Sequence, residues 1–116
     1  MTSYTINYTY LDFTNVASIE KELNQNKYDF IIHAAGTTKA KNQKEYNQVN
    51  ASYTINLATA AAKAGTGLQK MIFVSSLAAL GPLNQTDELI TENTVPAPVT
   101  AYGKSKLLAE QQLKRH

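Results

Sequence analysis

Tyr102 and Lys106 are the residues of this chain whose types and spacing best suit acid–base chemistry. They lie four positions apart in a segment with helical periodicity, and side chains at that spacing share one face of a helix. A free phenol has a pKa of about 10, which a neighbouring ammonium lowers because it favours the phenolate. Such a pair could carry a proton to or from a substrate hydroxyl. A tyrosine ring packed on a lysine stem has the same spacing, so the pair alone does not decide its role.

Strands and helices that would position this pair alternate along the chain. The pattern predicts strands at 4–11, 28–34 and 70–75, helices at 16–23 and 45–64, and a last helix from about residue 100. The first strand alternates apolar and polar residues, whereas the other two are apolar on both faces, as strands covered on both sides are. Strands alternating with helices indicate a parallel sheet with right-handed crossovers.

Small or polar residues gather where the three predicted strands end. These residues are Asp12, Ala34, Ala35, Gly36, Ser75 and Ser76. In open parallel sheets, ligands bind beyond the carboxyl ends of the strands. The sequence therefore predicts one site at this edge, although serines at strand ends are also common as turn residues.

Composition excludes several other kinds of site. The 116 residues carry a net charge of +2 and contain no cysteine, so there is no disulfide, thiolate metal site or cysteine nucleophile. The two histidines offer no metal-ligand cluster. No basic run favours nucleic acid, and no apolar stretch is long enough to cross a membrane. We therefore expect no nucleic-acid or membrane partner and a cytoplasmic location.

Four motifs in a particular order resemble the NAD-dependent epimerase/dehydratase family, the extended short-chain dehydrogenase/reductases. They are Ile31 to Gly36, Val49-Asn50, Phe73 to Ser76 with Gly81-Pro82, and Tyr102 to Lys106 with Ala109-Glu110. The resemblance covers the chain from about residue 4 to 112. It implies an α/β fold, here a partial Rossmann-type three-layer unit with about three parallel strands and three helices.

The resemblance also implies roles for residues at matching positions. Tyr102 matches the catalytic acid/base, and Lys106 matches the lysine that lowers the tyrosine pKa and binds the nicotinamide ribose. Ser76 matches the residue that hydrogen-bonds the reacting oxygen, and Asn50 matches the helix asparagine of the active-site network. The further cofactor-binding positions are Asp12 and Phe13 at the adenine and Ala34, Ala35 and Gly36 beneath the cofactor. His33 precedes these small residues and, judged alone, is a core histidine.

The family's phosphate-binding glycine turn has no match in this sequence. The five glycines, at 36, 65, 67, 81 and 103, do not have GxxGxxG spacing, and Gly65-Thr66-Gly67 precedes a strand and so ends a helix. Residues 1–116 thus resemble the third to fifth strands and the catalytic helix of the family, an internal piece of a longer protein. Strand edges left open would favour self-association.

The sequence is consistent with two functions. The chain is a segment of an NAD-dependent epimerase, dehydratase or reductase, with NADP not excluded, acting by hydride transfer on a sugar nucleotide or a similar hydroxyl or carbonyl compound. Alternatively, it is an inactive remnant or interaction module that has lost cofactor binding. The missing glycine turn favours the second function for these residues alone, and makes cofactor binding by them doubtful.

Overall fold

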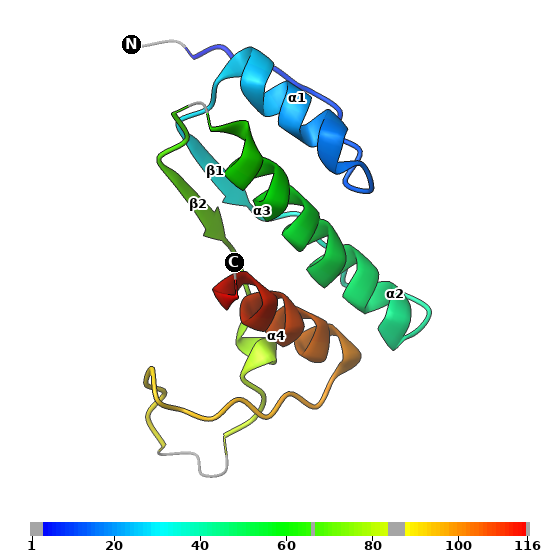
Figure 1. Ribbon diagram of the computed structural model, residues 1–116. Coiled ribbons are helices and arrows are strands. Elements are labelled where there is room, and N and C mark those ends of the chain that lie inside the picture. The colour runs from blue at the N-terminus through cyan, green and yellow to red at the C-terminus, as the bar shows by residue number, and fades with distance from the viewer. Residues whose placement is uncertain (1–3, 66, 84–87, 116) are drawn as a thin grey trace.

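A computed structural model describes residues 4–65, 67–83 and 88–115. Its helices and strands alternate along most of the chain (Figure 1). In order they are α1 (Val16–Asn26), β1 (Phe30–His33), α2 (Gln43–Asn47), the π-helical turn η1 (Gln48–Ser52), α3 (Tyr53–Ala64), β2 (Lys70–Phe73), the 3₁₀ turn η2 (Leu77–Ala79) and α4 (Ala101–Lys114). The helix expected over 45–64 is thus present as α2, η1 and α3 in succession.

Strands β1 and β2 pair in parallel, as predicted. Phe30 lies opposite Lys70 and His33 lies opposite Phe73. The Val74 amide then donates to the His33 carbonyl at 3.0 Å, which carries the pairing one residue beyond β2. The carboxyl ends of both strands therefore meet at one edge of the sheet.

Side-chain caps explain where the helices begin. Asn15 accepts a hydrogen bond from the Ser18 amide at the start of α1, and Thr100 accepts one from the Gly103 amide at the start of α4. Each cap satisfies a backbone donor that the first helical turn leaves without a partner. Gly65 ends α3 in the left-handed conformation with φ of 59°, as its place after the apolar stripe predicts.

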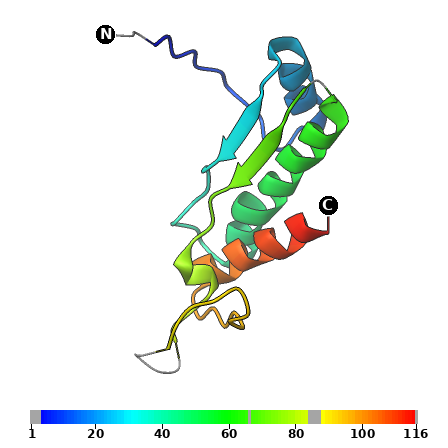
Figure 2. The ribbon, with the colours of Figure 1, turned by 90° about the vertical axis from the view of Figure 1, so that its left-hand side faces the viewer.

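The hydrophobic core lies between helices α1 and α3 and one face of the sheet. Figures 1 and 2 show α1 and α3 side by side along this face. The buried members are Ile19, Leu23, Leu57, Ala60 and Ala64, with Ile31 and Met71 of the strands packed against them. This face holds β1 and β2 in place, and so it positions their carboxyl ends.

The expected first strand is not formed. Residues 4–11 run without strand pairing, and Tyr4, Ile6, Tyr8 and Tyr10 are 71–90% exposed. Alternation of apolar and polar residues favours a strand only where a neighbouring strand takes up the backbone hydrogen bonds, and β1 and β2 pair only with each other. The sheet of the described residues therefore has two strands where about three were expected.

The outer face of the sheet is open, which also differs from the prediction of strands covered on both sides. Phe30 and Ile32 are 58% and 70% exposed, and Ile72 and Val74 are exposed as well. No helix among the described residues covers this face, so the unit has two layers rather than three.

Candidate active site

The first turn of α4 packs closely on the η2 turn. A Cβ atom built at Gly103 would lie 2.2 Å from the Ala78 carbonyl oxygen, which is closer than real Cβ atoms approach. Glycine is therefore required at this position for α4 to reach η2. The contact brings the segment that carries Tyr102 against the segment that follows Ser76.

Ser76 lies at the junction between β2 and η2. Its backbone is extended, and its Oγ accepts a hydrogen bond from the Ala78 amide at 3.1 Å, which caps the 3₁₀ turn. The Ser76 carbonyl accepts from the Ala79 amide at 3.0 Å. These bonds account for Ser76 as a turn residue and also hold its hydroxyl at the carboxyl edge of the sheet.

Lys106 places an ammonium group at the end of β2. Its side chain is only 4% exposed, and Nζ donates to the Val74 carbonyl at 2.9 Å. Nζ also lies 4.4 Å from the centre of the Phe73 ring, a cation–π distance. Burial lowers the pKa of Lys106, while the Glu110 carboxylate acts in the opposite direction. The structure thus brings Lys106 to the strand end.

Tyr102 is half-buried one turn before Lys106. Its ring packs edge-on against Tyr46 of α2, with 6.4 Å between ring centres. The Tyr102 carbonyl accepts a hydrogen bond from Ser105 Oγ at 2.6 Å. The ring is therefore oriented by an aromatic neighbour, and the backbone of its turn is fixed by Ser105.

Asn50 connects three segments through its buried amide. Oδ1 accepts from the Thr37 amide at 2.8 Å, while Nδ2 donates to the Thr37 carbonyl and to Ser105 Oγ, each at 3.0 Å. A Cβ atom at Gly36 would lie 2.8 Å from Oδ1, so the small residue there allows this close approach. Asn50 thereby ties the loop after β1 to α4.

His33 is a buried core histidine, as expected. Its Nε2 lies 2.9 Å from Thr54 Oγ1, which also donates to the Asn50 carbonyl at 2.9 Å. The Thr54 hydroxyl donates its only proton to the Asn50 carbonyl, so it can only accept a hydrogen bond from His33. His33 Nε2 is therefore the protonated ring nitrogen of this bond. Burial, followed by the charge of Lys106, lowers the pKa of His33. His33 is therefore neutral at pH 7.

The residues expected to bind the cofactor lie in two places. Phe13, Ala34 and Ala35 line one apolar pocket of about 500 Å³ beside β1. Ala34, Ala35 and Gly36 are exposed, so the backbone there is open to a flat group lying across it. Asp12 lines a separate pocket, where hydrogen bonds from the Thr14 hydroxyl and amide lower the pKa of its carboxyl.

Phe13 packs beneath α3 against the ring of Tyr53. Its ring stacks on Tyr53 at 6.2 Å and contacts His33 at 5.9 Å, and its carbonyl accepts from Asn56 at 2.7 Å. The open backbone at 34–36 and the adjoining pocket fit one part of a dinucleotide.

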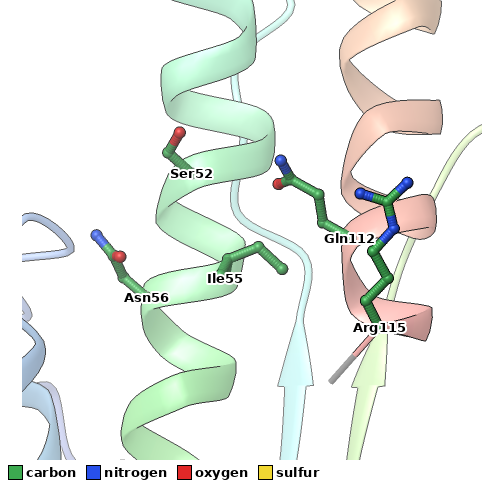
Figure 3. A pocket seen from close by; sticks show the side chains of 5 residues that line it. All are labelled: Ser52, Ile55, Asn56, Gln112 and Arg115. Carbon is green, nitrogen blue, oxygen red and sulfur yellow. The ribbon is translucent and has the colours of Figure 1, made fainter.

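A further surface pocket of about 370 Å³ lies between α3 and α4 (Figure 3). Its lining residues are Ser52, Ile55, Asn56, Gln112 and Arg115. None of these five residues belongs to the predicted site.

Within the described ranges, no group of three or more His, Cys, Asp or Glu residues is placed to hold a metal ion. In the same ranges, no helix is long and apolar enough to cross a membrane.

Comparison with known proteins settles the family. The model of the NAD dependent epimerase/dehydratase family matches residues 2–116. The chain belongs to this family. Among curated relatives of this epimerase/dehydratase chain, the uncharacterized protein y4nL of Sinorhizobium fredii is 37% identical over 84 residues, covering 72% of the chain and 23% of that protein. UDP-arabinose 4-epimerase 1 of Arabidopsis thaliana is 28% identical over 111 residues, covering 90% of the chain and 25% of that protein.

Solved structures agree with this assignment. The Bordetella bronchiseptica enzyme WbmG, solved in complex with NAD and UDP, superposes with a TM-score of 0.77 at 25% identity, over 91% of the chain and 33% of that enzyme. The α/β fold with a parallel sheet is therefore that of Rossmann-like epimerases. The chain spans about a quarter of the length of the two curated relatives.

Three residues that contact the predicted site or its neighbours were not given a role from the sequence. Ser105 and Thr54 are fully buried and bond the amide and the carbonyl of Asn50, and Glu110 accepts from Ser75 Oγ at 3.0 Å. Ser105 and Glu110 stand inside the quoted motif, but their partners lie 55 and 35 positions away. Local spacing gives no signal for contacts of that kind.

Proposed function

We propose that this chain provides the proton-transfer part of an NAD(P)-dependent epimerase, dehydratase or reductase acting on a sugar nucleotide or a similar hydroxyl or carbonyl compound. The observation that carries the proposal is the gathering of polar groups where β1 and β2 end. Lys106 is bonded to Val74, Asn50 is bonded to Ser105, and Ser76 lies at the turn on which Gly103 packs. These contacts surround the two turns of α4 that carry Tyr102 and Lys106.

The roles follow from the chemistry of each group. Tyr102 transfers the proton to or from the substrate oxygen, and Ser76 hydrogen-bonds that oxygen. Lys106, held at the strand end by Val74, supplies a positive charge and a donor for the nicotinamide ribose. Asn50 keeps the loop after β1 and the turn of Tyr102 in register.

Asp12, Phe13, Ala34, Ala35 and Gly36 are the proposed contacts of NAD, or of NADP, together with Tyr102 and Lys106. The bound nicotinamide would accept a hydride from the substrate carbon and return it. The open backbone at Ala34 to Gly36 and the pocket beside Phe13 support this placement. We further propose that residues 1–116 correspond to the third to fifth strands and the catalytic helix of a longer Rossmann domain.

An interaction module without cofactor binding is the second candidate. The observation that favours it is the absence of a GxxGxxG turn from the 116 residues, since that turn holds the pyrophosphate in Rossmann folds.

Calorimetric titration of the 116-residue chain with NADH and NADPH distinguishes the two functions. Lys106→Met removes the proposed ribose contact, and Lys104→Met, on the exposed face of the same helix, is the matched control. Micromolar binding that is lost in the first variant and kept in the second supports the enzyme. No heat at millimolar cofactor supports the interaction module.

We also propose that the chain self-associates through its open sheet. The outer edges of β1 and β2 have no strand partner among the described residues, and the face with Phe30, Ile32 and Ile72 is exposed. Such edges and faces pair readily with another chain. Sedimentation velocity over a hundredfold concentration range tests this, and a monomer at every concentration would refute it.

A further inference from the structure

Two side chains of α4, one turn apart, reach consecutive residues at the end of β2. Lys106 Nζ donates to the Val74 carbonyl at 2.9 Å, and Glu110 accepts from Ser75 Oγ at 3.0 Å. Residues four apart on a helix lie one above the other, so the two contacts form side by side. Together they fasten the segment after β2 to the catalytic helix.

We propose that Glu110 is a positioning residue, whose carboxylate holds Ser75 and thereby fixes Ser76 beside the helix that carries Tyr102. This inference rests on the proposed function, because Ser76 and Tyr102 are its reacting groups. Glu110 would act on them only through Ser75 and would not touch the substrate.

The contacts around Ser76 show how the effect is transmitted. Ser75 is bonded to Glu110 on one side of Ser76, and on the other side Ser76 caps η2 through the Ala78 and Ala79 amides. The η2 turn in turn packs against Gly103 of α4. Ser76 therefore has attachments to the same helix on both sides, and releasing Ser75 removes the nearer one on the strand side while the Lys106–Val74 bond remains.

The Glu110 carboxylate also affects the pKa of Lys106. Of the groups that face this ammonium, His33 of β1 is neutral and Phe73 of β2 offers only its ring, whereas Glu110 brings a negative charge. A carboxylate favours the ammonium form of a buried lysine. Loss of the Glu110 charge should therefore lower the pKa of Lys106 even where the bond to Ser75 survives.

Two substitutions of Glu110 separate position from charge. Glu110→Gln keeps an oxygen that accepts from Ser75 but removes the charge, whereas Glu110→Ala removes both. Ser75→Ala breaks the same bond from the other side and leaves the carboxylate in place. Glu20→Gln, on α1, makes the same change of net charge away from the site and is the matched control.

The experiment is NMR on the labelled 116-residue chain, with amide exchange at Ala78 and Ala79 and titration of the Lys106 ammonium as readouts. Loss of one hydrogen bond to a charged group corresponds to about a tenfold change or more. We expect exchange at both amides to rise about tenfold in Glu110→Ala and Ser75→Ala, with α3 amides unchanged. Glu110→Gln should exchange like the unsubstituted chain but share the lowered Lys106 pKa of Glu110→Ala.

Two results would overturn the proposal. One is unchanged exchange at Ala78 and Ala79 in Glu110→Ala, and the other is a rise that extends equally through α3, since that marks general destabilisation. A Lys106 pKa that does not move in Glu110→Gln, or that moves as much in Glu20→Gln, would refute the charge effect. None of these readouts needs cofactor binding, so a failure of the proposed function in calorimetry remains separate.

Discussion

At the scale of single residues, the side chain of Asn50 contacts the loop after β1 and helix α4 at the same time. Its amide oxygen and nitrogen bond both backbone groups of Thr37, and its nitrogen also bonds Ser105. A buried amide that uses its donors and acceptor in this way specifies one arrangement of the segments around it.

Replacement of Asn50 by alanine should therefore lower the free energy of unfolding by more than the loss of a few side-chain atoms would. The change removes the Asn50 partner of both the amide and the carbonyl of Thr37, whereas the Ser105 hydroxyl keeps its bond to the Tyr102 carbonyl. A buried unsatisfied group costs about 1–3 kcal/mol. We expect the free energy of unfolding in urea to fall by about 2 kcal/mol or more. Ser52→Ala, two residues later at an exposed position, should change it by less than about 0.5 kcal/mol.

Replacement of Lys106 by methionine should have the opposite effect on stability. A buried ammonium is costly because it has left water, and a methionine of similar length fills the same space beside Phe73. We expect the free energy of unfolding in urea to rise by about 1 kcal/mol. The same substitution should abolish the proposed cofactor binding. A variant less stable than the unsubstituted chain would show that the bond to Val74 outweighs the cost of burial.

Stability should depend on pH through His33. Its pKa is lowered from 6.5 in the folded chain, so below pH 6.5 the unfolded chain binds a proton that the folded chain does not. The free energy of unfolding should therefore be constant from pH 8 to 7 and fall as the pH drops below 6.5. Urea titrations at pH 8, 7, 6 and 5 measure this, and the fall between pH 7 and 6 should be smaller in His33→Gln.

At the scale of helices and strands, the prediction from the sequence was most accurate where the signal is local. Caps such as Asn15 and Thr100, and the glycine that ends α3, lie beside the residues that they act on, so helix ends could be located. The prediction of a strand over residues 4–11 was wrong. Alternation of apolar and polar residues favours a strand only where a neighbouring strand pairs with it, and residues 4–11 have no such pairing. Contacts such as Ser105 with Asn50 span 55 positions, and no local pattern encodes them.

The contact between α4 and η2 gives a prediction at this scale. In an ordinary helix, glycine to alanine stabilises by about 1 kcal/mol. Gly103→Ala should instead destabilise the chain, because its Cβ would lie 2.2 Å from the Ala78 carbonyl and must push η2 away. Lys104→Ala, at the exposed neighbouring position, is the control. A Gly103→Ala variant with a higher melting temperature would contradict the packing described here.

At the scale of the whole molecule, a two-layer unit leaves one apolar sheet face uncovered. Ile32→Lys places a charge in the middle of that face, where the side chain is 70% exposed and touches little of the core. We expect the urea midpoint to stay nearly constant while self-association weakens at least tenfold in sedimentation equilibrium. Gln25→Lys, at an exposed position of α1 outside this face, is the control that makes the same change of charge.

The π-helical turn at Gln48–Ser52 has a consequence for how the chain tolerates insertions and deletions. One residue more than a regular α-helix needs is absorbed there, so side chains beyond it are rotated by about 100° from the phase that a straight helix would give them. The residues before and within the turn contact α4, and those after it contact mainly α1. Removal of a single residue would make the helix regular but would turn one of these two faces away from its partner. The length of this segment is thus constrained by the packing on both sides of the turn.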